Sequence, residues 1–222
     1  KNVTKCSGGK RQRVALARAL ASDPEILFFD EPLSAIDYRL RKLLEVELKD
    51  LHRRTGKTFM YITHSLEEAM VMSDRIGIMR EGQIIQIGSP NDIYTRPQSR
   101  FVSQFMGEVN VLAVTASGDR LESTDYGTSL TSPADRPSEF EQGHLVIRPE
   151  SIRFVNEGAS AENQLTGVLY NEYAMGSRVQ YHVRVGEEMF TVEKLREQAY
   201  QGSLNDEVTI GWDAKDSVLV AD

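Results

Sequence analysis

A short apolar run that ends in two adjacent carboxylates, residues 26–31, constrains the fold more than any other part of the sequence. Residues 26–29 are all apolar without alternation, a pattern typical of a strand buried on both faces of a parallel sheet. Open α/β sheets bind ligands at the carboxyl ends of such strands. Asp30 and Glu31 then suit a ligand site, one acid holding a hard cation and the other accepting a proton from water. Solvated acids at an ordinary strand end are the alternative.

The stretch before this strand predicts a helix whose start could bind an anion. Residues 7–10 read SGGK: a serine that can cap the helix, two glycines that leave the first backbone N–H groups uncovered, and a positive charge. Residues 11–22 are rich in Ala, Leu and Arg, and Pro24 ends the helix. A plain capped helix is the competing interpretation.

A second helix and a second strand follow the acid pair. Residues 38–54 carry an apolar stripe at helical spacing, with Asp37 as the expected N-cap and Gly56 as the stop. Residues 58–63 are predicted to form another buried strand. If the two strands are parallel, their carboxyl ends lie at one edge of the sheet.

His64 stands at that edge, directly before another predicted helix. Residues 65–68, SLEE, form a capping box that opens this helix, which is expected to reach about residue 73. A lone histidine is usually structural, but one placed between a strand end and a helix start is a better candidate for phosphate contact.

The second half of the chain has a different pattern. Residues 75–88 predict a β-hairpin, and short helices are expected over 89–96 and 99–106. From residue 109 onward, short β runs alternate with glycine turns, which favours a small barrel or sandwich. We therefore expect two domains, 1–106 and 107–222.

Composition limits the classes of function. Residues 1–106 hold 17 Lys and Arg against 13 Asp and Glu, whereas residues 107–222 hold 9 against 20. The acidic second half argues against a nucleic-acid-binding tail. No apolar run approaches the roughly 20 residues that span a bilayer. The single cysteine, Cys6, excludes an internal disulfide and fits a reducing compartment.

The motifs of the first half resemble the ATP-binding subunit of an ABC transporter. CSGGK with its helix is similar to the signature motif, ILFFDEP to Walker B with the catalytic glutamate, SAID to the D-loop, and Thr63-His64 to the switch-histidine loop. IRPESIRF, residues 147–154, resembles the OB-like TOBE domain of importer ATPases. Residues 211–220 are similar to the polyamine branch.

The resemblance implies an α/β fold: a partial P-loop NTPase domain followed by an all-β OB-like domain. It implies ATP and Mg²⁺ as cofactors, with Asp30 holding Mg²⁺ through water, Glu31 polarising the attacking water, and His64 contacting the γ-phosphate. The remaining residues that it assigns to nucleotide binding, in part across a dimer interface, are Ser7, Gly8, Gly9, Lys10, Ser34 and Asp37.

The same resemblance implies partners and a location. A second copy of the chain would form a homodimer, membrane permease subunits would bind it, and an external solute-binding protein would act indirectly, with no role for nucleic acid. The expected place is the cytoplasmic face of a bacterial inner membrane. Spermidine or putrescine is the first expectation for the cargo, with iron, sugar or another small solute as alternatives.

The sequence departs from the family's pattern in two ways: substitutions in the signature and missing segments. Cys6 and Lys10 occupy signature positions that usually hold Leu and Gln. No G-x-x-x-x-G-K-[ST] motif, no adenine-stacking segment and no Q-loop are present. We therefore expect the C-terminal portion of a longer protein, inactive as an ATPase on its own.

Two other classes of function stay open. One is an ABC ATPase without a transport role, against which the IRPESIRF segment weighs. The other is a binding module whose OB-like part holds a small ligand or an oligonucleotide. Tyr170, Tyr173, Tyr181 and Phe190 could form a stacking face there, although a core role is favoured for them.

Overall fold

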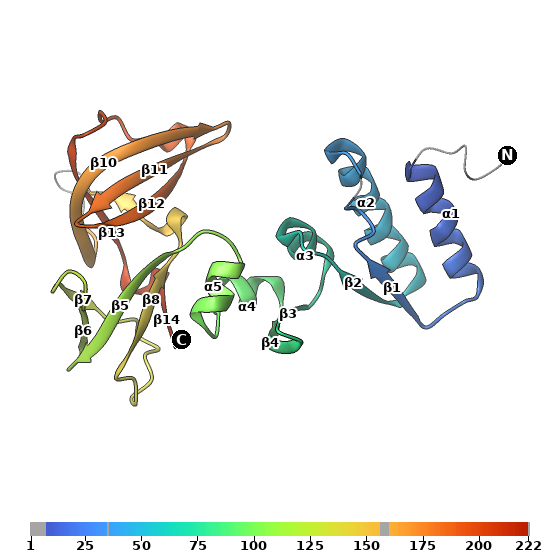
Figure 1. Cartoon of the computed structure of the whole chain (residues 1–222), viewed down its shortest axis with the longest axis horizontal. Helices are drawn as coiled ribbons and strands as arrows, with labels where there is room; N and C mark the ends of the chain where they lie inside the picture. The colour runs from blue at the N-terminus through green and yellow to red at the C-terminus, as the bar shows by residue number, and fades with distance from the viewer. Residues whose placement is uncertain (1–7, 35, 156–159, 222) are drawn as a thin grey trace. The chain divides into compact units, whose positions relative to one another are not determined.

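The computed structural model describes residues 8–34, 36–155 and 160–221 (Figure 1). These residues divide into two compact units, the first formed by residues up to 77 with 87–91, and the second by 78–86 with 92–222.

The first unit alternates helices and strands as the sequence predicts. Its elements are α1 (Gly8–Ala21), β1 (Ile26–Asp30), α2 (Tyr38–Thr55), β2 (Thr58–Ile62) and α3 (Leu66–Met72). The strands β1 and β2 are parallel, with Phe28 opposite Met60 and Asp30 opposite Ile62. The carboxyl ends of both strands therefore share one edge, which was the condition for bringing His64 near the acid pair.

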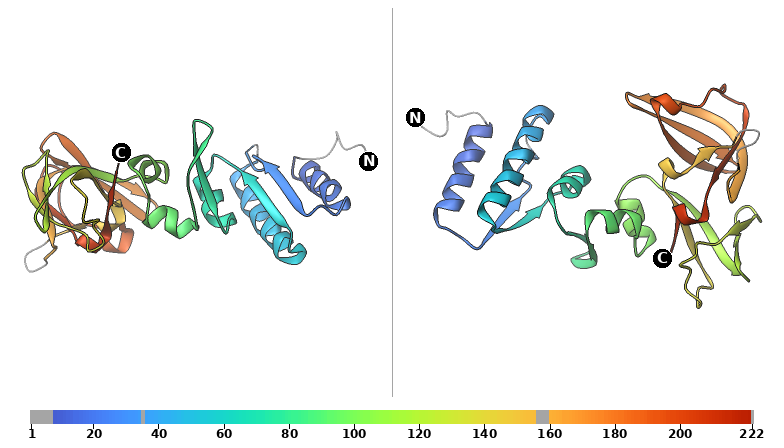
Figure 2. Two further views of the ribbon diagram at one scale, coloured as in Figure 1. Left: turned by 90° about the horizontal axis from the view of Figure 1, so that it is seen from below. Right: turned by 180° about the vertical axis from the view of Figure 1, so that it is seen from behind.

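Helices α1 and α2 lie side by side along β1 (Figure 2), and an Arg13–Glu47 ion pair of 2.8 Å joins them. The small core of this unit centres on Leu33, Leu44 and Leu48. Asp37 caps α2 at its start, and Gly56 ends it in the left-handed conformation at φ 63°, both as predicted.

The prediction that β1 is buried on both faces is wrong for the residues that the structure describes. Leu27 is buried, whereas Phe28 is 71% exposed, and Ile26, Met60 and Ile62 of the same sheet face are also exposed. The physical reason is that α1 and α2 both pack on the face that carries Leu27 and Phe29.

A hairpin and two short helices follow. The hairpin consists of β3 (Ile76–Arg80) and β4 (Gln83–Gly88), and the helices are α4 (Pro90–Thr95) and α5 (Arg100–Phe105). Glu81 and Gly82 both have positive φ, at 52° and 78°, as a two-residue hairpin turn of the primed type requires.

The second unit is dominated by two five-stranded antiparallel sheets. One has the order β14-β8-β5-β6-β7 and the other β12-β11-β10-β13-β9. The strands of the first sheet are β5 (Asn110–Ser117), β6 (Arg120–Ser123), β7 (Ser129–Thr131), β8 (Gln142–Ile147) and β14 (Ser217–Val220). Those of the second are β9 (Arg153–Phe154), β10 (Asn163–Met175), β11 (Arg178–Val185), β12 (Glu188–Leu195) and β13 (Glu207–Trp212). The described residues of this unit also form the single-turn 3₁₀ segments η2 (Pro149–Ser151), η3 (Arg196–Gln198) and η4 (Ala214–Asp216).

The inner side chains of the two sheets form one core. Tyr181, Val183 and Val185 of β11 are buried at every second position, which confirms the predicted alternation of residues 178–185. Trp212 of β13 is fully buried in the same core. This packing is what a small β-sandwich or barrel needs to be stable.

Arg148 ties the short helices to the β-sheets within the second unit. The side chain is 8% exposed and donates hydrogen bonds to the carbonyl oxygens of Ser103, Glu108 and Tyr94 at 3.1, 3.3 and 3.1 Å. Its guanidinium lies 4.0 Å from the centre of the Tyr94 ring. Residues 92–106 accordingly belong to the same compact unit as the β-strands. The domain boundary at 106/107 stays a prediction.

Among the described residues, no helix combines the length and the apolar character that crossing a bilayer requires.

Candidate functional site

Glu31 and His64 meet at the carboxyl edge of the β1–β2 sheet. Glu31 Oε1 lies 3.1 Å from His64 Nδ1, and both side chains are exposed. The backbone N–H of Glu31 donates to Ile62 O at 2.9 Å, which extends the pairing of the strands by one step. Glu31 has φ 42°, in the left-handed region, so the chain turns sharply where the strand ends. The structure thus brings together two residues that lie 33 positions apart.

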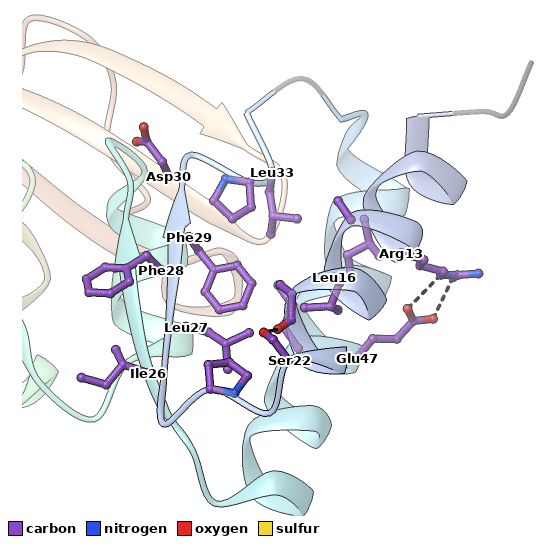
Figure 3. A pocket seen from close by; sticks show the side chains of 16 residues that line it. Arg13, Leu16, Ser22, Ile26, Leu27, Phe28, Phe29, Asp30, Leu33 and Glu47 are labelled. Carbon is purple, nitrogen blue, oxygen red and sulfur yellow. Dashed lines mark hydrogen bonds and ion pairs between the residues drawn. The ribbon is translucent and has the colours of Figure 1, made fainter. Parts of the chain in front are cut away.

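Asp30 is the last residue of β1 and is exposed (Figure 3). Its carboxylate is a hard oxygen donor, as Mg²⁺ prefers, and a magnesium ion held by one or two carboxylates keeps water and substrate phosphate as its other ligands. The residues present fit such a partial site. The described residues contain no group of three or more acidic, His or Cys side chains that could hold a metal by themselves.

The loop after Glu31 is held by local hydrogen bonds. Ser34 Oγ donates to Glu31 O at 3.0 Å, and Asp37 Oδ1 accepts from Leu40 N at 3.0 Å. Within this chain both predicted interface residues therefore support the loop and the start of α2. Residue 35 lies outside the described residues.

The predicted anion site at the start of α1 is described only in part. Ser7 lies outside the described residues, and α1 begins at Gly8. Gly9 and Lys10 are in its first turn, and the Lys10 side chain lies outside the part of the chain that the structure describes.

An apolar pocket of about 480 Å³ lies between α1, β1 and α2 (Figure 3). Leu27 and Phe29 point into it toward the helices, whereas Ile26 and Phe28 lie on the opposite side of the strand. Its lining is mostly hydrocarbon, and neither Glu31 nor His64 takes part in it. Because phosphates need N–H donors and cations, this pocket is not suited to a nucleotide's phosphates.

Glu68 supports the turn that carries His64, a role that the sequence did not predict. Its carboxylate is buried beneath the His64 turn and accepts from Tyr61 OH at 3.0 Å and Thr63 Oγ1 at 2.9 Å. Burial and the neighbouring Glu68 carboxylate raise the pKa of Tyr61 well above its ordinary value. The S-x-x-E spacing marked Glu68 as a helix-start residue but carried no signal for these contacts.

Two family models show that the chain contains part of an ABC transporter ATPase domain followed by a TOBE domain. Residues 1–34 match the sequence model of the ABC transporter family, and residues 145–220 match that of the TOBE domain. The predicted α/β fold with an OB-like second part is confirmed.

The relatives carry a more specific description. The chain is similar to proteins named spermidine/putrescine import ATP-binding protein PotA. The one from Mesorhizobium japonicum is 41% identical over 87% of this chain and 54% of the relative. The one from Methylococcus capsulatus is 51% identical over 72% of this chain and 43% of the relative. The protein of that name from Bacillus thuringiensis is 38% identical over 97% of this chain and 59% of its own length. The chain spans about half the length of the curated relatives that it matches.

Proposed function

We propose that this chain supplies the signature, Walker B, D-loop, switch-histidine and TOBE segments of the ATP-hydrolysing subunit of an ABC importer. The observation that carries this proposal is the 3.1 Å approach of Glu31 Oε1 to His64 Nδ1 at the edge where α/β sheets bind ligands. In this proposal the terminal phosphate of the nucleotide would lie next to these two side chains.

The chemistry follows from this geometry. Glu31 would accept the proton of the attacking water, and phosphoryl transfer depends mainly on such positioning and on charge stabilisation. Because Nδ1 of His64 faces Glu31, its Nε2 is left for contact with the γ-phosphate. Asp30 would hold Mg²⁺ through water, and the ion would neutralise phosphate charge.

The assembly belongs to the same proposal. The signature residues Ser7, Gly8, Gly9 and Lys10, with Ser34 and Asp37, would act on the nucleotide of a second copy in a homodimer. Permease subunits at the cytoplasmic face of a bacterial inner membrane would receive the conformational change of the homodimer. An external solute-binding protein would deliver the cargo. The names of the relatives support a polyamine as the cargo.

Replacing Glu31 by Gln in the whole ATPase subunit tests the catalytic part of the proposal. The amide cannot accept a proton, so we expect steady-state ATP turnover to fall by about 10²–10⁴-fold while ATP binding is retained. Glu25→Gln, an exposed glutamate just before the same strand, is the matched control and should keep its turnover. A Glu31→Gln enzyme with near-normal turnover would contradict the assignment of the acid pair.

Uptake measurements test the cargo. Cells that lack the endogenous subunit should regain uptake of labelled spermidine or putrescine when the whole subunit is supplied with its permease. Competition by excess unlabelled polyamine, and no competition by maltose or ferric iron, is the expected pattern. Restored uptake of sugar or iron instead would assign a different cargo.

A further inference from the structure

Glu68 occupies the first turn of α3 and is only 3% exposed. One carboxylate oxygen, Oε2, accepts from both Tyr61 OH and Thr63 Oγ1. The other, Oε1, lies 3.8 Å from Arg41 Nε of α2. A buried carboxylate is costly unless its oxygens are satisfied, so these contacts hold the surrounding groups in one arrangement.

The capping of α3 runs through Thr63. In a capping box, the glutamate accepts directly from the backbone N–H of the N-cap residue. Here Ser65 N donates to Thr63 Oγ1 at 2.9 Å, and that hydroxyl donates to Glu68 Oε2 at 2.9 Å. Ser65 Oγ accepts from Glu68 N at 3.3 Å, which closes the loop of contacts. The two chain neighbours of His64, Thr63 and Ser65, are therefore both held by hydrogen bonds.

Arg41 extends these contacts to the loop on the other side of the site. Its Nη2 donates to Ile36 O at 3.2 Å, next to Asp37 in the segment that resembles the D-loop. The buried carboxylate of Glu68 thus lies between the turn that carries His64 and the loop that follows Glu31. Both segments supply the groups that the proposed function uses.

We propose that Glu68 is a positioning residue for His64: through the Thr63 hydroxyl it holds the imidazole opposite Glu31. The proposal rests on the proposed function for its effect on ATP turnover, but its structural part stands on the hydrogen bonds alone. Glu68 touches no nucleotide and acts only through the turn. Its effect should therefore appear in kcat and not in the affinity for ATP.

The kinetic test uses the whole ATPase subunit with three variants. Thr63→Val removes the relaying hydroxyl at nearly unchanged volume. We expect kcat to fall by about 10-fold to 10²-fold, because a small misplacement of the His64 side chain lowers the rate by that much, while the KM for ATP stays nearly constant. Thr63→Ser restores a hydroxyl and should recover most of kcat. Glu67→Gln is the matched control, because Glu67 is the exposed neighbour that pairs with Lys42 at 2.6 Å.

A second measurement in the 222-residue chain needs no ATPase activity. The ¹⁵N shifts of the His64 ring report which nitrogen carries the proton. We expect a preference for Nδ1–H, facing Glu31, in the unaltered chain and in Thr63→Ser. Thr63→Val and Glu68→Gln should move the ring toward the tautomer ratio of an unrestrained histidine. Circular dichroism checks that each variant is folded, and Glu68→Gln replaces Thr63→Val if the latter unfolds.

The outcomes separate this inference from the proposed function. Unchanged ring shifts in both variants would overturn the positioning role, whatever the ATPase result. A kcat within twofold of the unaltered enzyme for Thr63→Val, or equal losses in Thr63→Val and Thr63→Ser, would also overturn it. If the ring shifts move as expected but the unaltered whole subunit hydrolyses no ATP, the proposed function fails and the structural role of Glu68 holds.

Discussion

Glu31 adopts φ 42°, a conformation that residues other than glycine rarely accept. The strained turn sends the chain away from β1 immediately after the strand ends, and its carboxylate lies against His64. Backbone strain of this kind persists only where surrounding contacts hold it, and it is common at functional sites. Glu31 is held by its hydrogen bond to Ile62 O and by hydrogen bonds from Ser34 N and Ser34 Oγ, beside its contact with His64.

Asp213 allows a prediction about acid stability at the scale of one residue. Its Oδ1 accepts from Arg153 Nη2 at 2.7 Å, and this hydrogen bond with the guanidinium lowers the pKa of Asp213 below its ordinary 3.8. The unfolded chain therefore binds this proton at higher pH than the folded chain does. The stabilisation is fully present above about pH 3.8 and is lost as the pH falls through the folded-state pKa.

Replacing Asp213 by Asn should remove that part of the pH dependence. We expect the melting temperature of the second unit, followed by Trp212 fluorescence, to fall less between pH 5 and pH 3 in Asp213→Asn than in the unaltered chain. Asp119→Asn, an exposed turn residue, is the charge-matched control. Parallel pH profiles for Asp213→Asn and the unaltered chain would contradict the prediction.

At the scale of elements, Arg148 joins α4 and α5 to the β-sheets. Burial lowers the pKa of its guanidinium, yet arginine stays charged, so its donors must find acceptors. The carbonyl oxygens of Tyr94, Ser103 and Glu108 provide them. These contacts explain why residues 92–106 join the β unit even though their sequence pattern is helical.

We predict that Arg148→Met lowers the free energy of unfolding of the second unit by about 3 kcal/mol, because it leaves three carbonyl groups without a donor. Arg148→Lys should cost less but not be neutral, since one ammonium cannot reproduce the planar fork. Urea unfolding followed by Trp212 fluorescence measures both. Hydrogen exchange should show faster opening of α4 and α5 in Arg148→Met, and equal protection in all three proteins would refute this role.

At the scale of the whole molecule, the sequence contains Asp30, Glu31, His64 and a segment that resembles the signature, but no G-x-x-x-x-G-K-[ST]. The β- and γ-phosphates of a nucleotide need a cradle of backbone N–H groups and a lysine, which that motif supplies. We predict that the 222-residue chain neither binds Mg-ATP with micromolar affinity nor releases phosphate. Exposed charges such as Arg11 are screened over about 8 Å at physiological salt and fix no geometry.

Calorimetry with Mg-ATP at about 0.15 M salt is the direct measurement for this prediction. Mg-ADP and ATP without Mg²⁺ serve as comparisons that separate specific binding from charge attraction. Micromolar affinity for Mg-ATP, or steady phosphate release, would mean that the nucleotide site lies elsewhere in the chain.

Local patterns were enough to predict the elements that carry the site. The unbroken apolar run predicted β1, and the caps Asp37 and Gly56 predicted both ends of α2. The order of strand and helix predicted that His64 lies at the same edge of the sheet as Glu31. Each of these signals depends on residues near one another in the chain, where propensity, capping and periodicity act. The roles of these residues in hydrolysis stay predictions.

Burial, by contrast, was decided by the tertiary structure. Of the four aromatic residues considered for a stacking face, Tyr181 and Phe190 are buried in the core, whereas Tyr170 and Tyr173 are about half exposed. A bulge at Tyr170 in β10 shifts the register with β11, so alternation along the strand no longer predicts which face a side chain occupies.

Local patterns in the sequence were sufficient to predict the class of fold, the order of the elements and the position of Asp30, Glu31 and His64 at strand ends. Packing between distant elements is what leaves Phe28 exposed, buries Arg148 among carbonyl groups and brings Glu68 into contact with the His64 turn. The two sets of features differ in how far apart along the chain the residues that determine them lie. Secondary structure follows from neighbours within a few positions, whereas burial and hydrogen-bond partners depend on which distant elements pack together.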